Sequence, residues 1–251
     1  SKEVKRIDLT QTFADAIIID AADPYILVKG FVVDKFGLVN TTKDTVQPLS
    51  EKLLSVRLIN NKQLIAQKEV DDAHSKIILS TVGEKTSKEI MNWDSSFELA
   101  FYPIDDTHIY IFEAPTDLAN ATVYTLDLAS AKSTIAYENL ATDIALSPDR
   151  TQIYYNYVEG KFIKTGIINR ANGEKKKIDA NIPVSLLVWG TDSTVFGVLQ
   201  NASTSLVRIN GTTFTLLGQK TYTSLTSLTF LPPATLLVVT DTGVQRISVK
   251  E

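Results

Sequence analysis

Residues 143–177 read DIALSPDRTQIYYNYVEGKFIKTGIINRANGEKKK and indicate the fold of the chain. A short apolar run at 144–146 leads into the turn residues 147–150. Two segments rich in β-formers follow, at 152–157 and 162–168, with Glu159-Gly160 between them and Asn172-Gly173 after them. Because these turn residues suit tight hairpins, the stretch predicts three strands and the start of a fourth. Such a unit is a four-stranded antiparallel sheet.

The same pattern recurs along the chain, which suits a sheet that must stack on copies of itself to bury both faces. Markers at the end of each first strand are 39, 43, 45, 43 and 41 residues apart: Asp20, Ile59, Tyr102, Ser147, Gly190 and Leu231. Each follows an apolar run and precedes a turn and a second apolar strand. A period of about 40 residues with four strands is typical of β-propeller blades.

We therefore predict an all-β chain, folded as a single six-bladed β-propeller domain over residues 1–251. The predicted blades cover residues 13–49, 50–93, 94–140, 141–182, 183–223 and 224–251. Residues 84–91 resemble a helix, but we interpret them as a turn and an outer strand, because a helix would interrupt the repeat.

The two ends of the chain complement each other in this scheme. The last blade stops one strand short, and residues 3–10, EVKRIDLT, form a lone strand pattern ahead of the first blade. We expect residues 5–9 to pair beside residues 245–249 and close the ring, since closure removes an open sheet edge. The alternative is that these N-terminal residues form a flexible leader.

Residues 144–154, IALSPDRTQIY, resemble the WD40-like repeat of TolB-type six-bladed propellers, in which Ser-Pro-Asp-Gly joins two strands. Arg150 stands where that family has glycine, and the other blades keep the pattern loosely. Residues 125–131, TLDLASA, resemble the end of the third strand in such repeats. The resemblance implies the propeller fold and favours a location in the cell envelope or exterior. It implies little about activity, because propellers host many unrelated functions.

Composition limits the partners of this chain. A net charge of -4 argues against nucleic acid, which favours a basic surface. The only run of basic residues, 175–177, falls in a predicted outer strand, where charge protects the edge. No apolar run is long enough to suggest membrane insertion within this chain, and the absence of cysteine excludes disulfides. We expect a monomer without a cofactor.

Both histidines of the chain lie in copies of Asp-Asp-x-His, at 71–74 and 105–108. Carboxylates and imidazole could bind a metal or act as an acid and base. The blade map places the first copy between a second and a third strand, and the other between a first and a second. These loops lie at opposite ends of a blade, so we predict solvated turns and no metal site.

Motifs that support catalysis are missing from the sequence. It contains no Gly-x-Ser-x-Gly, no phosphate-binding glycine loop and no Asp-x-Asp-x-Asp-Gly calcium loop. We therefore predict no enzyme and no catalytic residues. The alternative is a glycan- or small-ligand-binding module, or a hydrolase that uses two carboxylates at the central channel mouth.

Aromatic residues could form a ligand platform. We expect the alternating tyrosines Tyr154, Tyr155 and Tyr157 to pack between sheets instead. Trp189 is expected in the core, and Trp93, which directly precedes a blade, is expected to reach a face of the ring.

The preferred function is a non-catalytic scaffold that binds a protein partner on one ring face. That face carries the loops between second and third strands and the segments that lead into each blade. Its acidic character would suit a basic partner. The predicted binding residues are Lys29, Asp71, Asp72, His74, Asp94, Glu113, Asp143, Glu159, Asn201 and Asp241.

Overall fold

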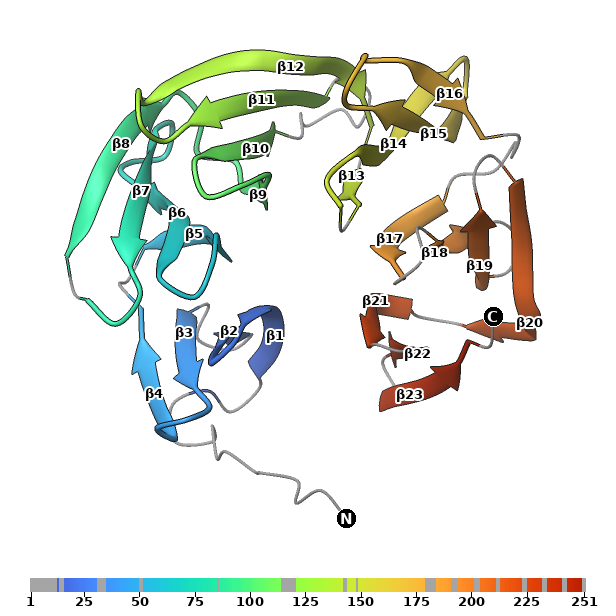
Figure 1. The fold of residues 1–251 in the computed structure, drawn as a ribbon, viewed down its shortest axis with the longest axis horizontal. Helices are drawn as coiled ribbons and strands as arrows, with labels where there is room; N and C mark the ends of the chain where they lie inside the picture. Colours follow the sequence, from blue (N-terminus) through green and yellow to red (C-terminus); the bar gives the residue numbers. More distant parts are fainter. Residues whose placement is uncertain are drawn as a thin grey trace. The chain divides into compact units, whose positions relative to one another are not determined.

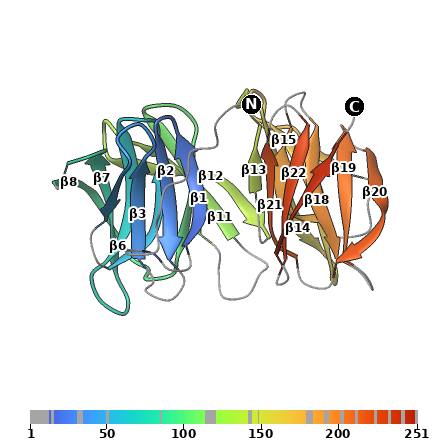
Figure 2. The ribbon, with the colours of Figure 1, turned by 90° about the horizontal axis from the view of Figure 1, so that it is seen from below.

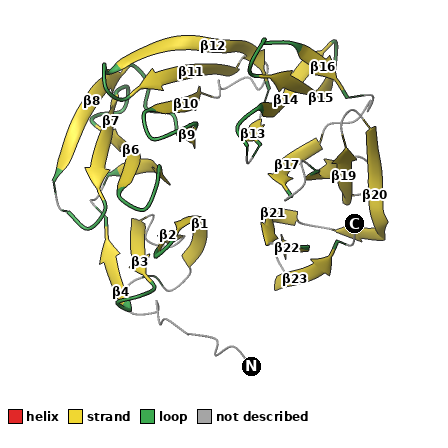
Figure 3. Cartoon of the chain, in the orientation of Figure 1, coloured by secondary structure: helices red, strands yellow, loops and turns green. Residues whose placement is uncertain are grey.

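The computed structural model describes most of the chain in fifteen segments. They are residues 13, 16–30, 35–49, 52–84, 86–113, 121–141, 144–147, 149–178, 184–190, 194–200, 204–210, 213–222, 225–231, 234–240 and 243–249. All regular structure within these segments is β-strand, and Figure 3 shows no helix among them.

The strands form six antiparallel sheets in which consecutive strands pair (Figure 1). Five sheets have four strands, and the last has three within the described residues. Each sheet lies inside one of the predicted blade ranges, and residues 87–93 form a strand, not a helix. The prediction of an all-β, six-bladed propeller fold is therefore confirmed. The closing strand predicted at residues 3–10 lies outside the described residues.

The chain divides into two compact units, Ser1–Glu113 with Val123–Ala136, and Ala114–Thr122 with Tyr137–Glu251. Sheets 1 to 3 form unit 1, although the boundary passes through the third and fourth strands of sheet 3. Their strands are β1 (Ala16–Ala22), β2 (Tyr25–Gly30), β3 (Lys35–Asn40) and β4 (Thr45–Pro48); β5 (Leu53–Leu58), β6 (Gln63–Glu69), β7 (Ser75–Thr81) and β8 (Ser87–Trp93); β9 (Leu99–Pro103), β10 (His108–Glu113), β11 (Ala121–Asp127) and β12 (Lys132–Leu140).

Sheets 4 to 6 form unit 2. Their strands are β13 (Ile144–Leu146), β14 (Gln152–Glu159), β15 (Phe162–Asn169) and β16 (Lys175–Lys177); β17 (Val184–Trp189), β18 (Val195–Gln200), β19 (Thr204–Asn210) and β20 (Thr213–Tyr222); β21 (Leu225–Leu231), β22 (Thr235–Thr240) and β23 (Gly243–Ser248). The basic run at 175–177 forms the outer strand of sheet 4, as predicted.

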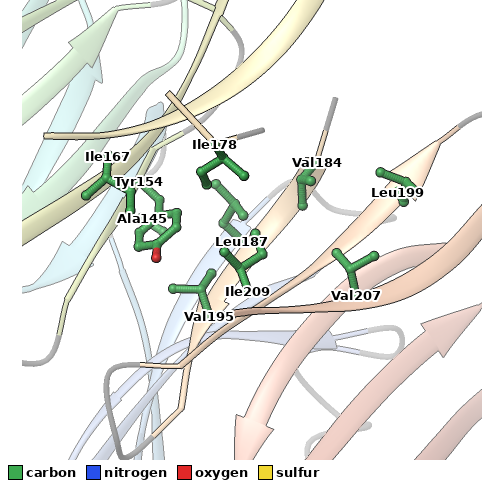
Figure 4. Close-up of a cluster of buried hydrophobic side chains, with 10 residues drawn as sticks. All are labelled: Ala145, Tyr154, Ile167, Ile178, Val184, Leu187, Val195, Leu199, Val207 and Ile209. Atoms are coloured by element: carbon green, nitrogen blue, oxygen red, sulfur yellow. The ribbon is translucent and has the colours of Figure 1, made fainter. Parts of the chain in front are cut away.

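Alternating side chains of neighbouring sheets build the core of each unit. In unit 1, one buried cluster joins sheets 1 and 2 through Leu27, Leu38 and Leu64, and another joins sheets 2 and 3. In unit 2, Tyr154 of sheet 4 packs with Val184 and other aliphatic residues of sheet 5 (Figure 4). This confirms that Tyr154 packs between sheets.

Antiparallel order places the loops of each sheet at two ends, and Figure 2 shows the strands running between them. The AB end carries the turn between first and second strands. The BC end carries the loop between second and third strands and the connection to the next sheet.

The turn after β13 explains the departure from glycine at position 150. Arg150 has a φ of 62°, in the left-handed region that favours glycine. Asp149 stabilises this turn by accepting hydrogen bonds from the Ser147 hydroxyl at 2.6 Å and from the Thr151 N–H at 3.1 Å. Arg150 thus takes a backbone conformation that favours glycine, at a conformational cost.

Candidate partner-binding surface

Seven of the ten predicted binding residues lie in the two units, and three lie outside the described residues. Lys29, Asp71, Asp72, His74, Asp94 and Glu113 lie in unit 1, at or near the BC ends of its sheets. Glu159 ends β14 in unit 2. Asp143, Asn201 and Asp241 lie outside the described residues.

The β6–β7 loop presents the first Asp-Asp-x-His copy at the BC end of sheet 2. Asp71 accepts hydrogen bonds from the backbone N–H groups of Ala73 at 2.9 Å and His74 at 2.8 Å, and its Oδ1 lies 2.8 Å from His74 Nδ1. The Ala73 N–H, followed by the His74 ring, lowers the pKa of Asp71 below its ordinary value. Asp71 therefore remains a carboxylate and shapes the loop.

Hydrogen bonds fasten this loop to the connection between sheets 2 and 3. The Ser96 hydroxyl donates to the Asp72 carbonyl at 2.6 Å, and the Ser75 hydroxyl donates to the Ser95 carbonyl at 2.6 Å. The segment 69–74, which contains this loop, and the connection at 94–98 therefore form one continuous surface within unit 1.

The buried side chain of Gln67 holds this surface in place. It is fully buried, and its Nε2 donates to the Phe97 carbonyl at 2.8 Å and to Ser75 Oγ at 3.0 Å. Its Oε1 accepts the Leu99 N–H at 2.8 Å. One amide thus satisfies backbone groups of the next sheet, which fixes the position of the connection that carries Phe97.

Two apolar side chains are exposed on this surface. Phe97 is 56% exposed and Val70 is 46% exposed. Residues 69–74 and 94–98 hold five carboxylates and no lysine or arginine: Glu69, Asp71, Asp72, Asp94 and Glu98. We call these two segments the Val70–Phe97 surface, which combines apolar anchors with an acidic surround.

Trp93 and Glu113 flank this surface on its buried side. The Trp93 indole N–H donates to Glu113 Oε1 at 3.1 Å, and its ring meets Tyr124 edge to face at 5.1 Å. Trp93 is only 8% exposed, so the prediction that it reaches a ring face is wrong. Packing between sheets 2 and 3 draws the indole inward, and Glu113 satisfies its polar edge.

Lys29 and Glu159 belong to other sheets than the Val70–Phe97 surface. The Lys29 ammonium lies 5.2 Å from the Phe36 ring centroid within sheet 1. In sheet 4, Glu159 accepts hydrogen bonds from Lys164 and Lys177, in that order of effect, and they lower its pKa to about 2. Glu159 is therefore neutralised by its own sheet.

The second Asp-Asp-x-His copy lies at the AB end of sheet 3. The Asn60 amide of sheet 2 donates to Asp106 Oδ1 at 2.8 Å, so the AB turns of the two sheets meet. The first copy lies at the BC end, and the two copies therefore occupy opposite ends of unit 1, as the blade map predicts. Among the residues with described positions, no three His, Asp or Glu side chains group as a metal site would require.

The charge states of the described carboxylates bear on acid catalysis. A general acid at neutral pH needs a raised pKa. Within the described segments, the pKa is lowered below its ordinary value at five carboxyl groups, those of Asp71, Asp105, Asp127, Asp149 and Glu159. These five carboxylates are thus unsuited to donate a proton at neutral pH.

Sequence reasoning missed the residues that make the surface continuous. Gln67 interrupts the apolar run of β6, and an amide inside such a strand signals a buried hydrogen-bond network. Val70 and Phe97 carried no comparable signal, because their exposure depends on how the loop and the connection meet.

Neither a family model nor a curated protein sequence matches this chain. Solved structures do. The oligogalacturonate lyase in complex with manganese superposes with a TM-score of 0.70 at 13% identity, over 94% of this chain and 76% of that one.

The chain has a six-bladed β-propeller fold. TolB from Acinetobacter baumannii matches this propeller with a TM-score of 0.60 at 14% identity, over 94% of this chain and 63% of that one. The acylaminoacyl peptidase of Pyrococcus horikoshii matches with a TM-score of 0.65 at 12% identity, over 94% of this chain and 45% of that one. The propeller thus spans less than two thirds of both proteins, and identities this low indicate the fold alone.

Within the described segments of the propeller, we find no helix with the length and apolar character needed to cross a membrane.

Proposed function

We propose that this propeller is a non-catalytic protein-binding scaffold of the cell envelope or exterior, and that the Val70–Phe97 surface docks a basic partner segment with an apolar anchor. The observation that carries the proposal is the exposed Phe97 ring on a connection held by Gln67 and Ser75. Aromatic side chains at the centre of an interface often dominate its binding energy. The expected location rests on the resemblance to TolB-type propellers.

The rigidity of the surface supports docking. The Ser96–Asp72, Ser75–Ser95 and Gln67–Phe97 hydrogen bonds hold the loop and the connection before a partner arrives. A partner would therefore lose little affinity to ordering of this surface. Exposed apolar side chains ringed by charge are typical of protein interaction sites.

The acidic charge of the Val70–Phe97 surface supports a basic partner segment. The carboxylates around Val70 and Phe97 face no lysine or arginine from the two segments that form the surface. They would steer a lysine- or arginine-rich segment toward the apolar anchors and penalise an acidic one. Association should accordingly weaken as salt rises.

The test is selection of binding peptides from a random display library. We expect enrichment of peptides in which lysine or arginine flanks an aromatic or aliphatic residue. The variant Asp71→Lys/Asp72→Lys should lose these peptides, and so should Phe97→Ser.

The second Asp-Asp-x-His copy offers a matched control. Asp105→Lys/Asp106→Lys makes the same charge change and removes an equivalent turn carboxylate, but at the AB end. This variant should retain the selected peptides. Equal binding by both double variants, or enrichment without a basic and apolar pattern, would refute the proposal.

The neighbours include a lyase and a peptidase as well as TolB, so the fold does not decide between binding and catalysis. The alternative of a carboxylate-based hydrolase needs a carboxyl group with a raised pKa. The pKa values of Asp71 and Asp105 are lowered, so neither of these two residues suits the role of that acid.

A further inference from the structure

A cavity of about 630 Å³ lies in unit 1 between the outer strand β4 of sheet 1 and the face of sheet 2. Its apolar lining includes Leu53, Leu64 and Ile78, each less than 9% exposed, and its outer rim includes Pro48 and Ser87. This volume is within the range of small-ligand sites, which are mostly apolar with a few polar groups. The cavity is separate from the Val70–Phe97 surface.

Small residues at two repeat positions open this space. In each of sheets 2, 3 and 4, the N–H of the residue that follows the third strand donates a hydrogen bond to a carbonyl of the AB turn. This shared bond gives a residue-by-residue alignment of the three sheets. In this alignment Ser80 of sheet 2 corresponds to Leu126 and Ile168, which are both fully buried. A half-buried serine thus lines the cavity where the next two sheets place a large aliphatic side chain.

The second strands show the same difference. The hydrogen bonds that close the AB turns align Ala66 of sheet 2 with Ile111 of sheet 3 and Tyr155 of sheet 4. Ala66 lines the cavity, whereas Ile111 packs in the core between sheets 2 and 3. Ser80 pairs with Leu64 and Ala66 pairs with Ile78, so the two small residues are diagonal neighbours. Because protein interiors are close-packed, small residues at these two positions leave a void that the two sheets do not fill themselves.

Polar groups mark the two ends of the cavity. Lys68 lines it near the BC end, and Glu84 lines it beyond the AB end of β7. In β6, Gln63 pairs with Thr81 and Lys68 pairs with Lys76, so the two ends are five residues apart along the strand. At about 3.4 Å per residue this separation is roughly 17 Å. The cavity is therefore long, apolar in the middle and oppositely charged at its ends.

Lys68 is the cation of this lining, and no ion pair to it occurs within the described residues. Its side chain is half-buried and lines the cavity, where its ammonium can meet an anion. Glu84 would repel a second negative charge at the far end. These features select a ligand with one anionic head and an apolar tail.

We propose that this cavity binds a medium-chain aliphatic monocarboxylate, with the carboxylate on Lys68 and the chain along Leu64, Ile78 and Leu53. A carboxylate accepts a charge-assisted hydrogen bond from an ammonium, and the tail gains from leaving water.

The test is isothermal titration calorimetry with dodecanoate below its micelle concentration. We expect saturable binding of dodecanoate, and weaker binding of dodecanol, dodecyltrimethylammonium and dodecanedioate. Lys68→Gln should weaken dodecanoate binding by about tenfold or more. Lys62→Gln, at an exposed position in the preceding AB turn, should bind as the wild type does.

Ser80→Leu tests the cavity without removing its charge. Leucine restores the residue found at the equivalent position of sheet 3, so the variant should fold and unfold at an equal or higher temperature while losing dodecanoate. The proposal is overturned if dodecanoate does not bind, if folded Ser80→Leu binds it as the wild type does, or if the uncharged and cationic analogues bind equally well. None of these outcomes depends on the peptide selection that tests the scaffold function.

Discussion

Replacing Gln67 by leucine should weaken the attachment between sheets 2 and 3, because the buried amide that bonds the two sheets is removed. The variant removes the partner of the Leu99 N–H and of the Phe97 carbonyl, while Ser75 keeps its bond to the Ser95 carbonyl. Leaving the buried N–H unpaired costs about 2 kcal/mol, and leaving the partly buried carbonyl unpaired costs about 1 kcal/mol. We therefore expect Gln67→Leu to lower the free energy of unfolding by about 3 kcal/mol.

Urea denaturation followed by tryptophan fluorescence measures this change, since Trp93 is buried between the same two sheets. For a chain of this size the loss corresponds to a fall in melting temperature of roughly 6–12 °C. The Leu99 amide should also exchange its hydrogen faster, because its acceptor is gone.

Gln63→Leu is the matched control, because Gln63 lies on the same strand and its side chain makes no hydrogen bond within the described residues. It should change the free energy of unfolding by less than about 0.5 kcal/mol. If Gln67→Leu unfolds at the same urea concentration as Gln63→Leu, the amide does not hold the sheets together and the reasoning is refuted.

Three further predictions concern single turns and bonds. Arg150→Gly should unfold at the same urea concentration as the wild type or at a higher one. Arg150→Val should lower the free energy of unfolding by about 1–2 kcal/mol, because a β-branched residue resists the left-handed φ of 62°. Equal stability of the two variants would contradict this. Burial raises the pKa of Asp105, but hydrogen bonds from Thr107 and His108 outweigh it and bring the pKa to about 2, below the ordinary 3.8. The charge of Asp105 therefore stabilises the fold above pH 3.8 and loses this effect as the pH falls toward 2. Asp105→Asn should lower the free energy of unfolding by about 1 kcal/mol at pH 7, a value discounted because the side chain is half-exposed. In urea titrations the variant should approach the stability of the wild type near pH 2. Asn156→Leu removes the acceptor of the Thr165 hydroxyl at 2.9 Å and should cost about 1–2 kcal/mol, less than Gln67→Leu, in the same denaturation assay; an equal or larger loss would show that the two amides do not differ as their bonds suggest.

The sequence predicts the sheets because their determinants are local. Alternating apolar residues and turn residues repeat every 40 or so positions, and the pairing of consecutive strands follows from short turns. Arg150 shows how far this goes, since it takes the glycine conformation that the Ser-Pro-Asp pattern predicts. Residues 87–93 likewise form a strand because the repeat outweighs their local helical character.

Contacts between sheets were harder to predict, because they depend on residues far apart in the chain. Trp93 directly precedes a new sheet, which suggests exposure, yet Tyr124 and Glu113 hold it inward. The acidic residues at 71, 72 and 94 could be assigned to one end of the blades from strand order alone. That the two segments meet around Phe97 requires the hydrogen bonds of Gln67 and Ser96, which no local pattern reveals.

The hydrogen bonds between sheets determine the order in which the sheets of unit 1 should detach under force. Sheets 2 and 3 are clasped at the AB end by Asn60 and Asp106 and at the BC end by Gln67. Sheets 1 and 2 are joined near the AB end, where Arg57 donates to the Ile19 carbonyl at 2.7 Å, and the hollow behind β4 separates their outer parts. A pulling force should therefore peel sheet 1 away first, while sheets 2 and 3 detach later as a pair.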